Sequence, residues 1–238
     1  MTDTKFSFKQ FDIHQDRCAM KVGTDGVLLG AWAYIPASGH ILDIGTGTGL
    51  LSLMAAQRSH TAQVTALEID SNAAEQAREN ALRSPWGERI TVVNDDFCKW
   101  ARQCEVRYNK IISNPPYFEQ SLLSPDASRT TARHTTMLTY DDIFSLARNL
   151  IAEGGSLSLV IPASMYEQVN HTAMLYGWGA SRLTLVRTTP RKPAKRALCE
   201  WRRNHYAPCR EEILTLNNPP QGYSEEYIRL TEPFYLKL

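Results

Sequence analysis

The chain has 238 residues, of which 43% are apolar, 21% charged and 9% aromatic; this composition fits one soluble domain and excludes collagen, coiled coil and intrinsic disorder. The formal net charge is only +1, so affinity for nucleic acid has to come from local clustering of basic side chains. Five cysteines without a C-x-x-C pair indicate neither a disulfide framework nor a zinc ribbon.

The N-terminus lacks the apolar segment of a signal peptide. The longest mostly apolar run, residues 26–37, is too short to span a bilayer. Together with the cysteine usage, this predicts a cytoplasmic protein without a membrane segment. We expect it to be a monomer.

The chain opens with a lead-in, in which a tight turn at residues 23–26 enters a helix at 27–33. From residue 41 onward, short apolar runs alternate with helix-like segments, which predicts a mostly parallel sheet with helices on both faces. The expected strands are residues 41–44, 64–67, 90–93, 110–113 and 157–161. The expected helices are 50–58, 72–82 after an N-cap at Ser71, 141–151 ending at Gly154-Gly155, and 164–175.

The C-terminal third has a different pattern. Residues 183–186 and 227–236 are strand-like, and we predict that they form antiparallel edge strands, which gives a seven-stranded sheet. Between them lies a basic arm. Residues 182–203 contain eight Arg or Lys against one acid, a net charge of +7, which leaves 18 basic and 24 acidic side chains, or −6, elsewhere.

A glycine-rich turn follows the strand at residues 41–44 and opens a helix. Its glycines are Gly45, Gly47 and Gly49, and such a turn lets a ligand approach bare backbone at a helix N-terminus. The spacing misses the dinucleotide fingerprint G-x-G-x-x-G by one residue, and no P-loop motif is present. Glu68, at the end of the next predicted strand, is suited to bind ribose hydroxyls.

These residues resemble the class I S-adenosylmethionine-dependent methyltransferases, whose first motif is an acidic strand end followed by G-x-G-x-G. The resemblance implies a Rossmann-like α/β fold in which the turn holds the methionine part of the cofactor, Glu68 binds the ribose, and Asp96 and Phe97 recognise the adenine. We expect one methyltransferase domain over residues 1–238, with a lead-in at 1–40, a catalytic core at 41–187, and the basic arm with a C-terminal strand at 188–238. The cofactor residues so implied are Asp43, Gly45, Thr46, Gly47, Gly49, Glu68, Asp96 and Phe97.

The tetrapeptide Asn114-Pro115-Pro116-Tyr117 directly follows a predicted strand, at the same edge of the sheet as the glycine turn. An exocyclic amine on a base is a poor nucleophile because its lone pair is delocalised into the ring. Two acceptors that bind both N–H groups restore nucleophilicity, and the Asn114 side chain and the Pro115 carbonyl are suitable acceptors. The prolines make the backbone rigid, and Tyr117 offers a face on which a flipped base can stack.

This motif resembles the [D/N/S]-P-P-[Y/F/W] signature of amino-methyltransferases, which act on adenine N6, cytosine N4 or a glutamine amide. The resemblance implies direct in-line methyl transfer, without a covalent intermediate, a metal or a strong general base.

Three substrate classes use this tetrapeptide. A DNA enzyme usually carries a separate recognition domain, and a glutamine methyltransferase of release factors carries an N-terminal helical domain, whereas only about 40 residues precede the first core strand here. RNA therefore fits best. Prolines hold the basic arm extended, and its cations can follow a phosphate backbone. The RNA-binding residues that we expect are Arg191, Lys192, Lys195 and Arg196 in the arm, with Arg129, Arg133 and His134 in a segment that closes over the flipped base.

Two alternatives stay open. One is glutamine methylation of a translation factor. The other is a non-catalytic RNA-binding protein on the same fold, which is disfavoured because Glu68, Asp96 and Asn114 are all present. The sequence also leaves undecided whether Trp178 and Trp201 belong to the core or stack on RNA.

From end to end, the chain resembles the bacterial tRNA adenine-N6 methyltransferases that modify adenosine 37 of a valine tRNA. The resemblance implies that Thr24 lines the carboxylate end of the cofactor. It implies no metal, and the irregular spacing of Cys199, His205 and Cys209 argues against a zinc site. The stretches that carry this resemblance are residues 8–15, 20–32, 112–118, 132–134 and 223–238.

Overall fold

The computed structural model describes residues 5–18, 20–116 and 138–237. Eight strands form one sheet in the order β10-β8-β9-β7-β6-β3-β4-β5, and β1 (Lys5–Ser7) pairs with β2 (Asp12–His14) in a separate two-stranded sheet. The eight strands are β3 (His40–Ile44), β4 (Gln63–Glu68), β5 (Ile90–Asn94), β6 (Tyr108–Ser113), β7 (Ile151–Pro162), β8 (Trp178–Arg187), β9 (Ala194–Arg203) and β10 (Arg210–Thr215).

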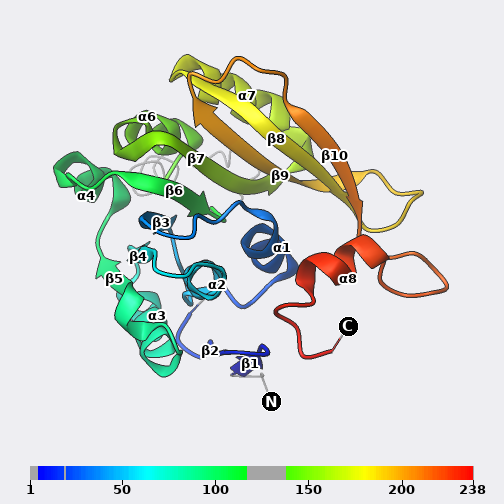
Figure 1. The fold of residues 1–238 in the computed structure, drawn as a ribbon, viewed down its shortest axis with the longest axis horizontal. Helices are drawn as coiled ribbons and strands as arrows, with labels where there is room; N and C mark the ends of the chain where they lie inside the picture. The colour runs from blue at the N-terminus through cyan, green and yellow to red at the C-terminus, as the bar shows by residue number, and fades with distance from the viewer. Residues whose placement is uncertain (1–4, 19, 117–137, 238) are drawn as a thin grey trace, which may run out of the picture.

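Helices cover both faces of this sheet, as the sequence predicts (Figure 1). One face carries α1 (Thr24–Trp32), α2 (Leu50–Arg58), α3 (Ser71–Arg83) and α8 (Glu225–Thr231). The opposite face carries α4 (Phe97–Gln103), α6 (Tyr140–Leu150) and α7 (Tyr166–Leu175).

Two apolar cores result from the alternation of side chains along the strands. In β3, Ile41 joins the core beneath α1 and α2, while Leu42 joins the core on the α6 side. In β6, Ile112 joins the core beneath α1 and α2, while Ile111 joins the core on the α6 side. Continuous apolar runs in the sequence therefore correspond to strands that are covered on both faces.

Most predicted elements are confirmed, with shifted ends. The helix at 50–58 has the predicted bounds, but the N-cap of α3 is Asp70, not Ser71: the Asp70 carboxylate accepts a hydrogen bond from the Ala73 N–H. Helix α6 ends at Leu150, and Gly154-Gly155 lie inside β7. The chain enters the strand directly after the helix, so these glycines do not serve as a helix C-cap.

The C-terminal third differs most from the prediction. Residues 227–236 do not form a strand, because α8 starts after Ser224, whose hydroxyl accepts a hydrogen bond from the Tyr227 N–H. The buried side chains Tyr227, Thr231 and Phe234 follow a helical spacing that the apolar content of this segment obscures. The basic arm instead contributes β9 and β10, so the sheet has eight strands rather than seven.

Strand directions also differ from the expectation. Within the eight-stranded sheet that the described residues form, only β9 runs antiparallel to both of its neighbours, whereas β10 is parallel to β8. Residues 183–186 lie in β8, which is flanked by β9 and β10 and is not an edge strand. Among the described residues, no helix is long and apolar enough to cross a membrane.

A buried lysine in the middle of β6 links this strand to β7 and β9. The Lys110 ammonium is fully buried and donates to Ser156, Ser158 and Glu200, at 2.8, 2.6 and 2.9 Å. Burial lowers the pKa of Lys110 to about 8, so the group is still mostly protonated at neutral pH. The network connects β6 to β7 and β9 and fixes their register.

Replacing Lys110 by methionine leaves the Glu200 carboxylate buried without its cation. We expect Lys110→Met to lower the free energy of unfolding by about 3–5 kcal/mol, measured by urea denaturation. The control, Lys5→Met, removes an exposed ion pair with Asp12 and should cost less than about 1 kcal/mol. Equal effects of the two substitutions would contradict this role of Lys110.

Candidate active site at the carboxyl edge of the sheet

Three sequence motifs lie at the ends of three adjacent strands. Strand β3 lies between β4 and β6, and all three run parallel, so their carboxyl ends meet at one edge of the sheet. The glycine turn follows β3, Glu68 ends β4, and Asn114 follows β6. In open parallel sheets, this edge is where ligands bind.

The glycine turn presents bare backbone at this edge. Gly45, Gly47 and Gly49 have φ values of 69°, 57° and 88°, a left-handed conformation that favours glycine. A Cβ added at Gly45 would meet no atom within 4 Å, so this backbone faces open space. A Cβ at Gly49 would lie 3.5 Å from Ala77 of α3. The first glycine thus exposes the turn to a ligand, and the last is favoured by its left-handed φ rather than by lack of space, because 3.5 Å is an ordinary van der Waals distance.

Glu68 is held beside this turn. One carboxylate oxygen accepts from the Gly47 N–H at 2.8 Å and the other from the Asp70 N–H at 3.0 Å. A carboxylate has further lone pairs, so it can still accept hydroxyl groups of a ribose. The next residue, Ile69, is 57% exposed and offers an apolar surface at the same strand end. Ile69 was not predicted as a site residue, although it is a single apolar residue between two acids, Glu68 and Asp70.

Asp43 is the most unusual group of the site. It is fully buried, and one carboxyl oxygen accepts from Thr46 at 2.6 Å and from Ser52 at 2.8 Å. The other oxygen has no hydrogen-bond partner among the described residues. Burial raises the pKa of Asp43 to about 6. A buried carboxyl with an unpartnered oxygen fits a cationic ligand, and S-adenosylmethionine carries two cationic groups, a sulfonium and an ammonium.

The predicted adenine-recognition residues lie at the start of α4. The Asp96 carboxylate caps this helix by accepting from the Lys99 N–H at 2.9 Å. The Phe97 ring is buried in the core on the α6 side. The backbone N–H of Phe97, in the first turn of α4, is therefore the group suited to a base edge.

Helix α1 reaches the site from the lead-in. A Cβ added at Gly26 would lie 2.9 Å from the Leu50 side chain and 3.8 Å from the Asn114 amide nitrogen, so the first turn of α1 lies against both motifs. Asn114 is half-buried and Pro115 is buried. Thr24, the first residue of α1, is exposed next to this contact. The predicted residues Tyr117, Arg129, Arg133 and His134 lie outside the described residues.

The basic residues of the arm fall into two groups. Five of the eight contact other parts of the chain: Arg182 bonds Glu212, Arg187 bonds Thr215, Arg196 bonds Asp25, Arg202 bonds the Gly154 carbonyl, and Arg203 bonds the Arg148 carbonyl. The other three, Arg191, Lys192 and Lys195, are exposed at the tip of the β8–β9 hairpin. Because β8 runs parallel to β7, the tip lies at the carboxyl edge, with the three motifs.

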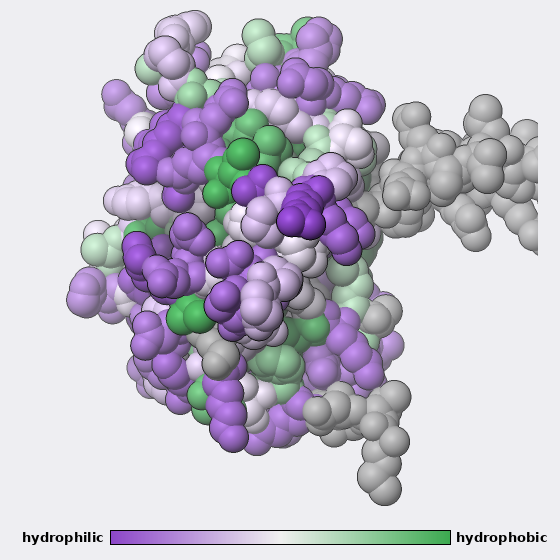
Figure 2. Space-filling model, turned by 90° about the vertical axis from the view of Figure 1, so that its right-hand side faces the viewer, coloured by the Kyte–Doolittle hydropathy of each residue, from purple (hydrophilic) through white to green (hydrophobic). Residues whose placement is uncertain are grey.

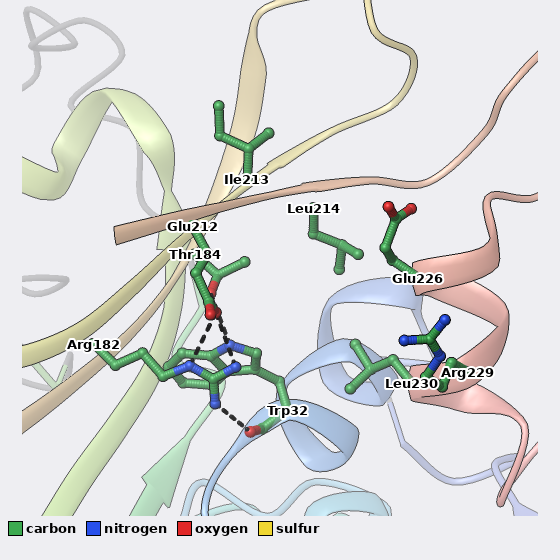
Figure 3. A pocket seen from close by; sticks show the side chains of 9 residues that line it. All are labelled: Trp32, Arg182, Thr184, Glu212, Ile213, Leu214, Glu226, Arg229 and Leu230. Carbon is green, nitrogen blue, oxygen red and sulfur yellow. Dashed lines mark hydrogen bonds and ion pairs between the residues drawn. The ribbon is translucent and has the colours of Figure 1, made fainter. Parts of the chain in front are cut away.

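Arg182 is one of the five arm residues that contact other parts of the chain (Figure 3). Its guanidinium lies 4.4 Å from the centre of the Trp32 ring and bonds Glu212, beside a cavity of about 550 Å³ between β10 and α8. On that side of the molecule, apolar surface lies among hydrophilic side chains (Figure 2). No residue of the three motifs lines this cavity.

The tryptophans left open by the sequence belong to the core. Trp178 and Trp201 are buried, and their indole N–H groups donate to the Phe144 carbonyl and the Asn170 side chain. Cys199 is buried in β9. Within residues 5–18, 20–116 and 138–237, no cluster of three His, Cys, Asp or Glu side chains is arranged to hold a metal ion.

Several known proteins are similar to this chain in sequence. Residues 23–175 match the family model of the methyltransferase small domain. The chain is 48% identical to the tRNA1(Val) (adenine(37)-N6)-methyltransferase of Bacteroides fragilis, with 100% of both chains covered. It is 44% identical to the protein of the same name from Erwinia tasmaniensis, over 97% of this chain and 94% of that one.

Solved structures show the same fold at low sequence identity. A predicted O-methyltransferase from Agrobacterium tumefaciens, protein Atu636, has a TM-score of 0.70 and 22% identity over 88% of this chain and 96% of that one. TrmN from Thermus thermophilus has a TM-score of 0.54 and 20% identity over 75% of this chain and 48% of that one.

The raised pKa of Asp43 predicts pH-dependent cofactor binding. Below pH 6 the carboxyl is mostly protonated and neutral, and above it the carboxylate attracts a cation. Affinity for S-adenosylmethionine should therefore rise by about tenfold from pH 5 to pH 7 and then level off. Calorimetric titrations at several pH values measure this change. Asp43→Asn should abolish the inflection, and a flat wild-type profile would contradict the assignment.

Proposed function

Because the chain belongs to the family of the tRNA1(Val) (adenine(37)-N6)-methyltransferases, we propose that it transfers the methyl group of S-adenosylmethionine to N6 of adenine 37 in a valine tRNA. One observation supports this chemistry most strongly. The glycine turn, Glu68 and Asn114 lie at the ends of the adjacent strands β3, β4 and β6, which brings a nucleoside-binding carboxylate next to an acceptor for an amine. Since one chain carries all three motifs, we propose a single-domain monomer, and because its relatives are named for a tRNA substrate, we propose that it acts in the cytoplasm.

The residues at the edge fit the cofactor. We assign its methionine part to the backbone of Gly45, Thr46 and Gly47, and its carboxylate end to Thr24. Asp43 offsets the cationic charge from beneath the turn. The ribose is assigned to Glu68, and the adenine to the Asp96 side chain and the Phe97 backbone. Once bound, the cofactor supplies an electrophilic methyl group on a sulfonium.

The target amine is assigned to the segment after β6. The Asn114 side-chain oxygen and the Pro115 carbonyl each accept one N–H of the adenine amine, which draws the nitrogen towards a tetrahedral geometry. Pro115 and Pro116 make that carbonyl rigid, and Tyr117 is assigned to stack on the base. The amine proton becomes acidic only as the carbon–nitrogen bond forms and leaves to solvent, so no strong base is required.

The tRNA backbone is assigned to the hairpin tip. Arg191, Lys192 and Lys195 are exposed at the edge that holds the three motifs, where phosphates on either side of a flipped nucleotide would lie. Arg196 belongs to the same predicted set, and in the structure its guanidinium faces Asp25. Arg129, Arg133 and His134 are proposed to contact RNA from the segment before α6.

Label transfer tests this function. Radioactive S-adenosylmethionine is offered to unmodified tRNA transcripts, duplex DNA and a panel of translation factors, and the labelled product is digested. N6-methyladenosine in tRNA is the expected product. Label on a glutamine amide would replace the proposal by protein methylation, and bound cofactor without any label would favour the non-catalytic RNA-binding alternative.

Asn114→Ala tests the acceptor role. The variant should bind cofactor normally but lose at least about 100-fold in kcat, because the substitution removes an acceptor that acts in the transition state. Asn114→Asp retains an acceptor oxygen and should keep more activity than the alanine variant. Nearly full activity of Asn114→Ala would refute the role.

Changing Arg191, Lys192 and Lys195 together to glutamine tests the hairpin tip. The slope of log K for tRNA against log salt should flatten by about 2 to 3, because each phosphate that the tip no longer neutralises keeps its own counterion. Arg203→Gln, at the opposite end of β9, is the matched control. An unchanged slope in the triple variant would show that the tip is only a solvated loop.

A further inference from the structure

The first turn of α1 is a junction between three parts of the molecule. Thr24 begins the helix and is the residue assigned to the carboxylate end of the cofactor, Asp25 faces the basic hairpin, and Gly26 lies against Asn114. Three consecutive residues thus connect the proposed cofactor, RNA and amine sites. The turn lies close to Asn114, because a Cβ added at Gly26 would be in van der Waals contact with the Asn114 amide nitrogen, at 3.8 Å.

The contact with the hairpin is an ion pair. The Arg196 Nε donates to the Asp25 carboxylate at 2.7 Å, and the two side chains are 34% and 26% exposed. Arg196 is the third residue of β9 and pairs with Pro162 at the end of β7, so its guanidinium is anchored at the carboxyl edge. Ion pairs with this exposure contribute little to global stability. We therefore expect loss of this pair to change the free energy of unfolding by less than about 1 kcal/mol.

We propose that Arg196 is a positioning residue: through Asp25 it docks the β8–β9 hairpin on the first turn of α1 and thereby keeps that turn and Asn114 in the productive geometry. This inference rests on the proposed function. The exposed tip residues Arg191, Lys192 and Lys195 hold the RNA, and the Arg196–Asp25 pair connects the bound RNA to the segment that holds the amine.

A direct phosphate contact by Arg196 predicts a different result. In that case Arg196 alone would matter for RNA affinity, and Asp25, an acid near a phosphate, would weaken binding rather than support turnover. If the two residues act as one unit, removing either has the same consequence, and removing both adds nothing.

A double-mutant cycle distinguishes the two roles. Asp25→Asn, Arg196→Gln and the double variant are compared with wild type in kcat and KM for tRNA, cofactor affinity, salt dependence of tRNA binding and melting temperature. Each single variant should lose about tenfold in kcat, with the double variant no worse. Cofactor affinity, the salt slope and the melting temperature should stay near wild type. Arg196→Lys, which keeps the charge, should recover part of the activity.

Two results would overturn the proposal. A lower salt slope for Arg196→Gln together with normal Asp25→Asn would make Arg196 a phosphate contact. Wild-type kcat in both single variants would make the pair a surface ion pair without a role in turnover.

Limited proteolysis tests the docking without RNA, so it holds even if label transfer to tRNA fails. Trypsin cleaves after Arg191, and the cleavage rate follows the local opening of the hairpin. Both single variants should be cut several-fold faster than wild type, while Arg203→Gln, which lacks only a bond to the Arg148 carbonyl, should not. Equal rates in all four proteins would show that the pair does not dock the hairpin.

Discussion

The hydrogen bond from the Gly47 N–H to Glu68 is the interaction on which the site depends. It fixes a left-handed glycine turn against the end of the neighbouring strand, so that the bare backbone and a carboxylate face the same space. The turn cannot adopt this shape with ordinary side chains, and Glu68 cannot reach it unless β3 and β4 are parallel neighbours in register. The parallel sheet therefore brings together the backbone and the carboxylate that we propose as the cofactor site.

The same edge determines where the other substrate lies. Strand β6 is the second neighbour of β3, so the segment Asn114-Pro115-Pro116 begins beside the turn. Strand β8 runs parallel to β7 and ends at the carboxyl edge, where the hairpin to the antiparallel β9 carries three exposed cations at its tip. Under the proposed function, strand order brings the sites for the methyl donor, the amine and the RNA backbone together at one edge of the sheet.

The central elements were predictable because local signals agreed with tertiary structure. The apolar runs of β3, β4 and β6 indicate strands, and the spacing of apolar residues at 50–58 indicates a helix. The glycine spacing indicates the turn between them. The C-terminal third was less predictable. Tyr227 and Phe234 are aromatic and suggest a strand, but their spacing and the cap at Ser224 produce α8. No local pattern reveals that five of the eight basic residues of the arm contact other parts of the chain, because their partners, such as Asp25 and Thr215, are distant in sequence.

The arrangement of the methyl donor and the target amine can be tested by a crystal structure with the demethylated cofactor product and a valine tRNA anticodon stem-loop. We expect a flipped adenine with its N6 within about 3.2 Å of both the Asn114 side-chain oxygen and the Pro115 carbonyl. We also expect the ribose of the cofactor product on Glu68. An adenine bound with its amine away from Asn114, or a cofactor product bound elsewhere than the glycine turn, would contradict this arrangement.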